Sequence, residues 1–236
     1  MREKKTERTA RRAPKPEGRR DHDTSIATRS VERALASRYS TYLDEVQRLI
    51  KAGVRVMKRT GSFDPRVSDV VVEAGLSNQG FYRHFRSKDE FLLAVLDDGV
   101  RELVGYLRHR MQSAPSPTEQ IHCWIEGIVA QAMNPDAAQA TRPFVIPQSH
   151  LAERFPDEVA SSIRQLTMLL HEAIDKAVAA GDLPGADPAR DARAIYDLAI
   201  GWLHRALVDP EPPSREAGEH LVEFAMGGLR REPKAS

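Results

Sequence analysis

Residues 65–90 read PRVSDVVVEAGLSNQGFYRHFRSKDE, and this stretch decides the fold of the N-terminal half of the chain. Apolar residues at helical spacing in 65–74, and Phe81 and Phe85 four residues apart, predict two short amphipathic helices. The segment 74–77 joins them, with a glycine that can end the first helix and a serine that can cap the second. We therefore predict a helix-turn-helix, whose second helix buries its aromatic side chains and exposes its polar ones.

The segments on either side of this stretch continue the helical pattern. Apolar residues recur on one helical face over 42–57, and Thr41 with Asp44 is typical of a capping box. This pattern predicts a helix over about 41–59. A second capping box at 87–90 predicts the start of a long helix, which prolines end about 28 residues later.

Charge is divided unevenly along the chain. Residues 1–90 carry 21 Lys and Arg against 13 Asp and Glu, whereas residues 91–236 carry 14 against 21. This division predicts that only one end of the molecule meets a polyanion. Residues 1–37 are basic and almost free of large apolar side chains before Ile26, so we predict a disordered arm. Two interpretations stay open, an arm that contacts DNA phosphates and a passive solvated tail.

The rest of the chain is also predicted to be helical. Apolar residues at helical spacing indicate helices at 117–133, after Pro156, and at 188–208 and 214–230. Prolines at 143 and 147 are expected to break the chain between the first two of these. We predict an all-α protein in four parts: the arm at 1–37, a three-helix helix-turn-helix domain at 38–86, a helical domain at 87–230, and a tail at 231–236.

Composition and motifs exclude several classes of protein. The single cysteine, Cys123, excludes a disulfide framework. No apolar run approaches the roughly 20 residues of a membrane span, and the charged N-terminus lacks a secretory signal. No GxSxG, HExxH or glycine-rich phosphate loop is present. We therefore expect a cytoplasmic protein with no membrane partner, no catalytic residues, no metal and no cofactor.

The stretch 75–90 resembles the signature of the tetracycline-repressor (TetR) family. In that family a Gly-hydrophobic-Ser turn precedes aromatic-Tyr-x-His-Phe and then x-Ser-Lys-x-Glu. The resemblance covers about residues 41–97, with two departures: Val71 replaces a usual alanine, and Gly80 replaces a usual threonine or alanine. The resemblance implies double-stranded DNA as a partner, a homodimer, and a small-molecule effector bound by the C-terminal helices.

The candidate DNA contacts lie on and around the second helix of the motif. Asn78 and Gln79 can each make paired hydrogen bonds to adenine, and a helix fits the major groove. Plainer roles stay open, with Ser77 acting only as a cap, Tyr82 as partial core, and Arg83 and Lys88 as surface charge. Together with the resemblance, the DNA-binding candidates are Ser68, Ser77, Asn78, Gln79, Gly80, Tyr82, Arg83, His84 and Lys88.

The C-terminal helices supply the candidates for ligand binding and dimerisation. Apolar and aromatic residues between these helices would line a pocket for a mostly apolar small molecule, although each can instead be ordinary core. The ligand candidates are Leu103, Leu107, Trp124, Ile128, Phe144, Met168, His171 and Tyr196. The last two helices would form a four-helix dimer seam, or else only an internal hairpin. The dimer candidates are Ile195, Leu198, Ala199, Trp202, Ala206, Leu221, Phe224, Ala225 and Gly228.

These observations favour a ligand-responsive transcriptional regulator, and a repressor in particular. Such a dimer would bind a near-palindromic operator and be released by its effector. Two alternatives remain: a DNA-binding regulator without a small-molecule inducer, and a helical small-molecule enzyme or carrier.

Overall fold

The computed structural model describes residues 25–145 and 149–231. Every regular element in these two ranges is an α-helix, which confirms the prediction of an all-α protein. The contacts divide the chain into two units, residues 1–43 and 44–236. The larger unit carries the helix-turn-helix and the helical domain that follows it.

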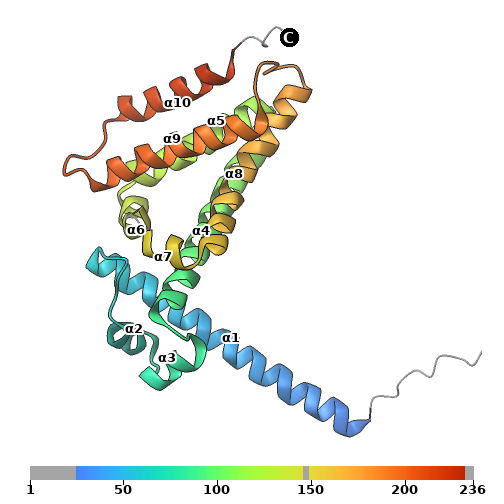
Figure 1. Cartoon of the computed structure of the whole chain (residues 1–236), viewed down its shortest axis with the longest axis vertical. Coiled ribbons are helices and arrows are strands. Elements are labelled where there is room, and N and C mark those ends of the chain that lie inside the picture. The colour runs from blue at the N-terminus through green and yellow to red at the C-terminus, as the bar shows by residue number, and fades with distance from the viewer. Residues whose placement is uncertain (1–24, 146–148, 232–236) are drawn as a thin grey trace, which may run out of the picture. The chain divides into compact units, whose positions relative to one another are not determined.

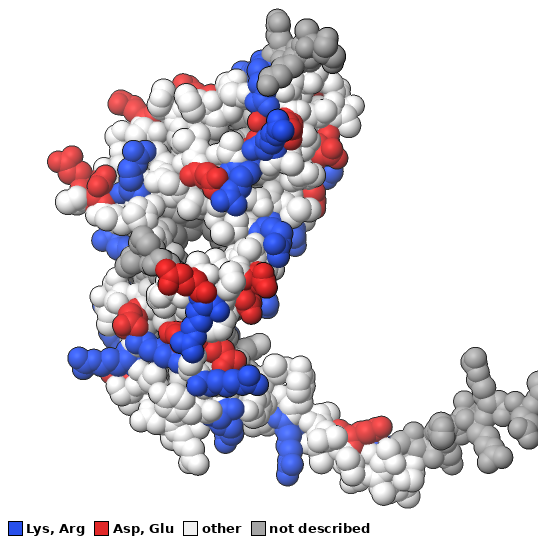
Figure 2. All heavy atoms as spheres, in the orientation of Figure 1, with Lys and Arg blue, Asp and Glu red and all other residues white. Residues whose placement is uncertain are grey.

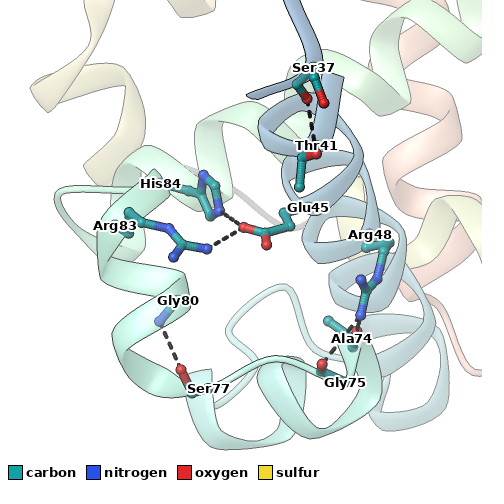
Figure 3. A network of polar contacts seen from close by, with 10 residues as sticks. All are labelled: Ser37, Thr41, Glu45, Arg48, Ala74, Gly75, Ser77, Gly80, Arg83 and His84. Carbon is teal, nitrogen blue, oxygen red and sulfur yellow. Dashed lines mark hydrogen bonds and ion pairs between the residues drawn. The ribbon is translucent and has the colours of Figure 1, made fainter. Parts of the chain in front are cut away.

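The first helix, α1 (Ile26–Thr60), begins earlier than the sequence pattern predicted. The predicted helix start near residue 41 and the disordered arm up to 37 are wrong for residues 26–37. The physical reason is that residues 26–52 contain no Pro or Gly and many good helix formers. Thr41 does not cap a helix, because its Oγ1 donates a hydrogen bond of 3.0 Å to the Ser37 carbonyl inside α1 (Figure 3). The rest of the predicted arm, residues 1–24, lies outside the described residues.

The helix-turn-helix consists of α2 (Val67–Ala74) and α3 (Asn78–His84), as the sequence predicted. Gly75 ends α2 with a positive φ of 63°, a conformation that glycine adopts without steric cost. The Ser77 hydroxyl accepts a hydrogen bond of 3.0 Å from the Gly80 N–H and so caps α3. The turn is therefore fixed at both helix ends by local chemistry.

Aromatic side chains form the core under the helix-turn-helix. Phe81, Phe85 and Phe91 pack with their ring centroids 5.2–5.6 Å apart. Leu49 of α1 and Val70 of α2 join them and are fully buried. Fully burying a side chain of this size stabilises the fold by about 1.5–3 kcal/mol, so this core ties α3 to α1 and α2.

The long helix α4 (Lys88–Gln112) begins directly after α3. The Ser87 hydroxyl accepts a hydrogen bond from the Glu90 N–H, and the Glu90 carboxylate accepts one from the Arg86 N–H. The start of α4 contributes Phe91 to the core of the helix-turn-helix, whereas Leu107 near its end packs in a second core. One rigid element therefore connects the two cores, as its path in Figure 1 illustrates.

The second core is built by the remaining helices. Trp124 of α5, Leu170 of α8 and Ile195 of α9 are buried together in it. Pro143 lies in the last turn of α6, so the break predicted at Pro143 and Pro147 does not occur at Pro143 itself; α6 ends at Val145, and Pro147 lies outside the described residues. Arg231, assigned to the tail, forms an ion pair with Asp191. The helices after α4 are α5 (Pro117–Met133), α6 (Pro135–Val145), α7 (Ser149–Arg154), α8 (Pro156–Ala179), α9 (Pro188–Val208) and α10 (Arg215–Leu229).

Candidate nucleic-acid interface and helical cavity

The exposed face of α3 presents amides and one aromatic side chain. Asn78 and Gln79 are exposed in its first turn, and Tyr82 is 58% exposed one turn later. Amide side chains can make paired hydrogen bonds to adenine in the major groove, and a tyrosine hydroxyl can reach a phosphate. This face therefore has the chemistry that a recognition helix needs.

Three other DNA-binding candidates on α3 are placed differently. Gly80 is buried in the first turn of α3. The His84 side chain has no exposed surface, and its Nε2 lies 2.6 Å from Glu45 Oε2 of α1. Arg83 forms an ion pair with the same carboxylate (Figure 3). The structure thus does not bring Gly80 or His84 to the exposed face, because the core and Glu45 hold that side of α3.

Two residues of α1 that the sequence analysis did not single out organise this arrangement. Hydrogen bonds from His84 and Arg83 lower the pKa of the Glu45 carboxyl from its ordinary value. One turn further on, Arg48 Nη2 donates hydrogen bonds to the carbonyls of Ala74, at 2.6 Å, and Gly75, at 3.3 Å. The sequence offered only a weak signal for this pair, two opposite charges one turn apart on a partly apolar helix.

The DNA-binding candidates outside α3 also form contacts within the protein. The Ser68 hydroxyl is exposed and donates to Asp69 Oδ1 at 3.3 Å, and Lys88 forms an ion pair with Asp64. Ser77 is exposed while it caps α3, and capping does not exclude a phosphate contact. Val72 of α2 is 80% exposed, an apolar side chain that the sequence analysis did not consider.

Basic side chains surround the helix-turn-helix. Figure 2 shows Lys and Arg side chains over the part of the molecule that carries α2 and α3, with acidic side chains among them. Arg55 and Arg59 are paired with Glu73. Arg66 and Arg86 are exposed and have no ion pair within the described residues, so their charge is available to phosphates. Sequence reasoning missed these two arginines because Arg66 precedes α2 and Arg86 occupies a variable position of the signature.

A cavity of about 890 Å³ lies in the larger unit, between the helices that follow the helix-turn-helix. Three of the ligand candidates line it: Leu103, Phe144 and Tyr196. Its wall also includes Val54 and Lys58 of α1. Residues from the helix-turn-helix side and from the helical domain therefore share one cavity.

The other five ligand candidates do not line this cavity. Leu107, Trp124 and Ile128 are fully buried in the second core, where neighbouring helices cover them on all sides. Met168 is exposed and His171 is half-buried on α8. The sequence pattern identified these side chains as apolar or as lying on a helix face that packs against other helices. The pattern cannot distinguish a side chain in a cavity wall from one in a packed core.

A few polar groups lie among the apolar walls of the cavity. The Thr141 hydroxyl donates a hydrogen bond of 3.1 Å to Gln131 Oε1. Burial raises the pKa of the Tyr196 hydroxyl, so this group stays protonated at neutral pH and can donate a hydrogen bond. Ser162, also in the wall, is buried. The wall also carries the charged residues Lys58, Glu102 and Arg110. Apolar walls with a few polar groups suit an amphipathic small molecule.

The predicted dimer residues of α9 and α10 divide into buried and exposed sets. Phe224 is 64% exposed, Leu198 and Gly228 are exposed, and Trp202 and Ala206 are half-buried. These side chains are available to a second copy of the chain. The remaining candidates pack inside their own protomer, because the same stripe supplies the second core: Ile195, Ala199, Leu221 and Ala225.

Within residues 25–145 and 149–231, no group of three or more His, Cys, Asp or Glu side chains is placed to hold a metal ion. No helix in those ranges is both long enough and apolar enough to cross a membrane.

Known proteins share the helix-turn-helix segment. Residues 49–95, from α1 to the start of α4, match the family model described as bacterial regulatory proteins, tetR family. The HTH-type transcriptional regulator BetI of Brucella canis is 34% identical over 91 residues, which are 39% of this chain and 43% of BetI. The chain thus matches less than half the length of this curated relative.

Solved structures share the fold over most of the chain. A TetR/AcrR-family transcriptional regulator from Thermobifida fusca YX-ER1 is 25% identical with a TM-score of 0.57, covering 80% of this chain and 100% of its own. FadR from Bacillus subtilis, solved in complex with stearoyl-CoA, is 15% identical with a TM-score of 0.59 and covers 78% and 98%. RolR, solved in complex with resorcinol, is 12% identical with a TM-score of 0.60 and covers 81% and 90%. The last two similarities concern the fold alone.

The family, the curated relative and the Thermobifida fusca protein are named as transcriptional regulators rather than enzymes. The matched segment contains the complete helix-turn-helix, and the helices after it share their arrangement with solved regulators. The helix-turn-helix segment of this chain is similar to the TetR family of bacterial regulatory proteins, and the chain shares its fold with a solved regulator of the TetR/AcrR family.

Proposed function

We propose that the protein is a transcriptional repressor that binds a near-palindromic operator as a homodimer and is released by a small, mostly apolar effector. The observation that carries this proposal is the continuity of α4, which starts at the end of α3 and lines the cavity with Leu103. A ligand that favours one position of α4 would shift the position of the recognition helix.

DNA recognition in this proposal rests on α3 and its surroundings. Asn78 and Gln79 read base edges, while Tyr82, Arg66 and Arg86 contact phosphates. A single motif of this size makes few contacts. A dimer gains a second half-site about 34–36 Å away and with it the affinity that an operator requires.

The dimer in this proposal forms through the exposed faces of α9 and α10. Leu198, Phe224 and Gly228 form its centre, and Val208 at the end of α9 is a further apolar side chain with 56% exposure. Large exposed apolar side chains on two neighbouring helices mark a surface that a partner covers. A four-helix seam would bury them in both copies.

The effector in this proposal is an uncharged or weakly charged amphipathic molecule held in the cavity. Leu103, Phe144 and Val145 supply apolar contacts, and Tyr196 and the Gln131–Thr141 pair supply hydrogen bonds. Two solved structures of similar fold carry small organic ligands, stearoyl-CoA and resorcinol. They support a ligand-binding role for a domain of this fold. The chemistry of the effector proposed here is inferred from the residues that line the cavity of this protein.

A second contact supports a coupling between the cavity and DNA binding. Phe144 of α6 lines the cavity, and its ring lies 5.6 Å from that of Phe63 in an edge-to-face arrangement. Phe63 is buried in the core of the helix-turn-helix. A ligand that displaces Phe144 would therefore act on both α4 and the segment before α2.

The test starts with enrichment of DNA duplexes from a random pool by the purified protein. The proposal expects a near-palindromic sequence bound by one dimer, and an absence of enrichment contradicts it.

A panel of neutral amphipathic compounds is then screened by thermal shift, since a ligand of the native state raises the melting temperature. Stabilising compounds should release the selected duplex from the wild-type protein but not from Ala140→Phe, which fills the cavity. Stabilisation without release favours a regulator that has no small-molecule inducer.

A further inference from the structure

One turn of α1 contacts both helices of the DNA-binding motif through polar side chains. Arg48 donates two hydrogen bonds to the carbonyls at the end of α2, and Glu45, three residues before it, accepts contacts from Arg83 and His84. Figure 3 shows the two side chains reaching from α1 to different parts of the motif, Arg48 to the turn after α2 and Glu45 to the last turn of α3. The spacing of three residues places both on the same side of α1.

The charges of the two contacts match the groups that they hold. The carbonyls at the C-terminal end of α2 carry the negative end of the helix dipole, which a guanidinium stabilises. The last turn of α3 carries Arg83 and His84, and a carboxylate is an acceptor for both. Glu45 is only 19% exposed and the His84 side chain is enclosed, so solvent and salt screen this contact less than a surface ion pair.

The recognition helix depends on such contacts because it is short. It has seven residues, and Gly80 in its middle is a weak helix former without a side chain. Its start is fixed by the Ser77 cap, and its end is held by the core phenylalanines and by Glu45. A displacement of the end rotates Asn78 and Gln79, whose base contacts tolerate little deviation in distance and angle.

We propose that Glu45 is a positioning residue for operator recognition, acting through Arg83 and His84 on the C-terminal end of α3. It also balances the charge of Arg83 and so limits sequence-independent attraction to phosphates. This inference rests on the proposed DNA-binding function, and its first test is chosen to be independent of DNA.

The first test is amide hydrogen exchange of the full-length protein without DNA. Glu45→Gln keeps the size of the side chain and removes its charge. The matched control is Glu73→Gln, which removes a carboxylate that holds Arg55 and Arg59 between α1 and α2. We expect Glu45→Gln to accelerate exchange over 78–84 severalfold, because local opening follows the lost contact. Glu73→Gln should leave exchange over 78–84 at the wild-type rate, and unchanged exchange in Glu45→Gln overturns the inference.

The second test measures affinity for the duplex that the wild-type protein enriches and for a scrambled duplex of the same composition. Glu45→Gln should lower the ratio of the two affinities roughly tenfold, the scale of one impaired base contact. Glu73→Gln should keep the wild-type ratio. The slope of log affinity against log salt should steepen by up to about one in Glu45→Gln, and adding Arg83→Gln should restore it.

The outcomes separate the two proposals. A wild-type protein that enriches no duplex contradicts the proposed function, and hydrogen exchange then decides on Glu45. A protein that enriches a duplex and keeps its affinity ratio in Glu45→Gln overturns the positioning role alone.

Discussion

Single residues on α3 fall into two groups with opposite tasks. Phe81, Phe85 and His84 face the protein and fix the helix, whereas Asn78 and Gln79 face outward. Only the outward group is free to exchange water for base edges when DNA binds. Substitutions in the two groups should therefore change different measurements, DNA specificity for the outward group and folding for the inward group.

Asn78→Ala tests the outward group. Loss of one paired contact to a base should weaken binding to the selected duplex by about 1–3 kcal/mol and leave binding to a scrambled duplex nearly unchanged. Fluorescence anisotropy titrations of both duplexes measure this. Gln139→Ala, an exposed glutamine on α6, is the control and should bind like wild type. Equal losses on both duplexes would show that Asn78 does not read sequence.

Acid pH tests the contact of Glu45 with His84 and Arg83. The pKa of Glu45 is lowered in the folded protein, so its stabilising contribution is present above its unfolded pKa, near 4.5. The contribution is lost as pH falls through the lower folded value, because both states then bind the proton. Melting temperatures between pH 7 and pH 3 should fall less steeply for Glu45→Gln than for wild type. Parallel curves for the two proteins would contradict this assignment.

The role of single residues was predictable where local chemistry decides it and unpredictable where distant elements meet. Ser77 and Gly75 were assigned correctly because a cap and a positive φ are local requirements. His84 was assigned to DNA because nothing near it in sequence shows that Glu45, 39 residues earlier, turns it inward. A pair so distant in sequence leaves no periodic signal.

At the scale of elements, the close approach of α1 to α4 depends on one glycine. A Cβ at Gly53 would lie 2.5 Å from Cζ of Phe91, whose ring is enclosed by Phe81 and Phe85. The ring has little freedom to move, so the two helices can pack at this distance only because position 53 has no side chain.

Gly53→Ala should therefore destabilise the protein. Overpacking costs about 1–3 kcal/mol, and the better helix propensity of alanine offsets part of it, so a net loss of about 1–2 kcal/mol is expected. Urea unfolding measures the difference. Gly105→Ala on α4 is the matched control, since open space surrounds that position, and it should raise stability by up to about 1 kcal/mol. A loss of similar size in both variants would contradict the packing argument.

Helix positions were largely predictable from apolar periodicity, and their ends less so. The starts of α3 and α4 were predicted because serines cap both helices. The start of α1 was placed too late because Thr41 and Asp44 resemble a capping box, although helix formers precede them without interruption. Pro143 and Pro147 were expected to break the chain between the helices at 117–133 and after Pro156, but α6 runs through Pro143 and ends at Val145.

At the scale of the whole molecule, two cores are connected by α4, and one cavity has walls from α1 and from the C-terminal helices. The existence of two helical parts was predictable from sequence, whereas the cavity wall was predictable only in part. Trp124 and Ile128 share the periodicity of Leu103, yet only Leu103 lines the cavity. Periodicity reports which side of a helix is apolar and not whether a neighbour fills the space beside it.

Dimerisation is testable on the exposed face of α10. Phe224→Glu places a charge on a side chain that is 64% exposed in the protomer, so it should disrupt the dimer without unfolding the chain. Light scattering after size exclusion should change from about 53 kDa, twice the chain mass, towards 26.4 kDa. Met168→Glu, an exposed apolar residue on α8, should remain dimeric. If the Phe224→Glu variant remains dimeric, the dimer interface does not include this face of α10.

A crystal structure of the protein bound to its selected duplex would show whether α3 reads operator sequence from a dimer. We expect one dimer on each near-palindrome, α3 of both copies in successive major grooves, Asn78 and Gln79 at base edges, and His84 still held by Glu45. A complex in which α3 lies outside the major groove, or in which His84 leaves Glu45 to contact a phosphate, would contradict this expectation.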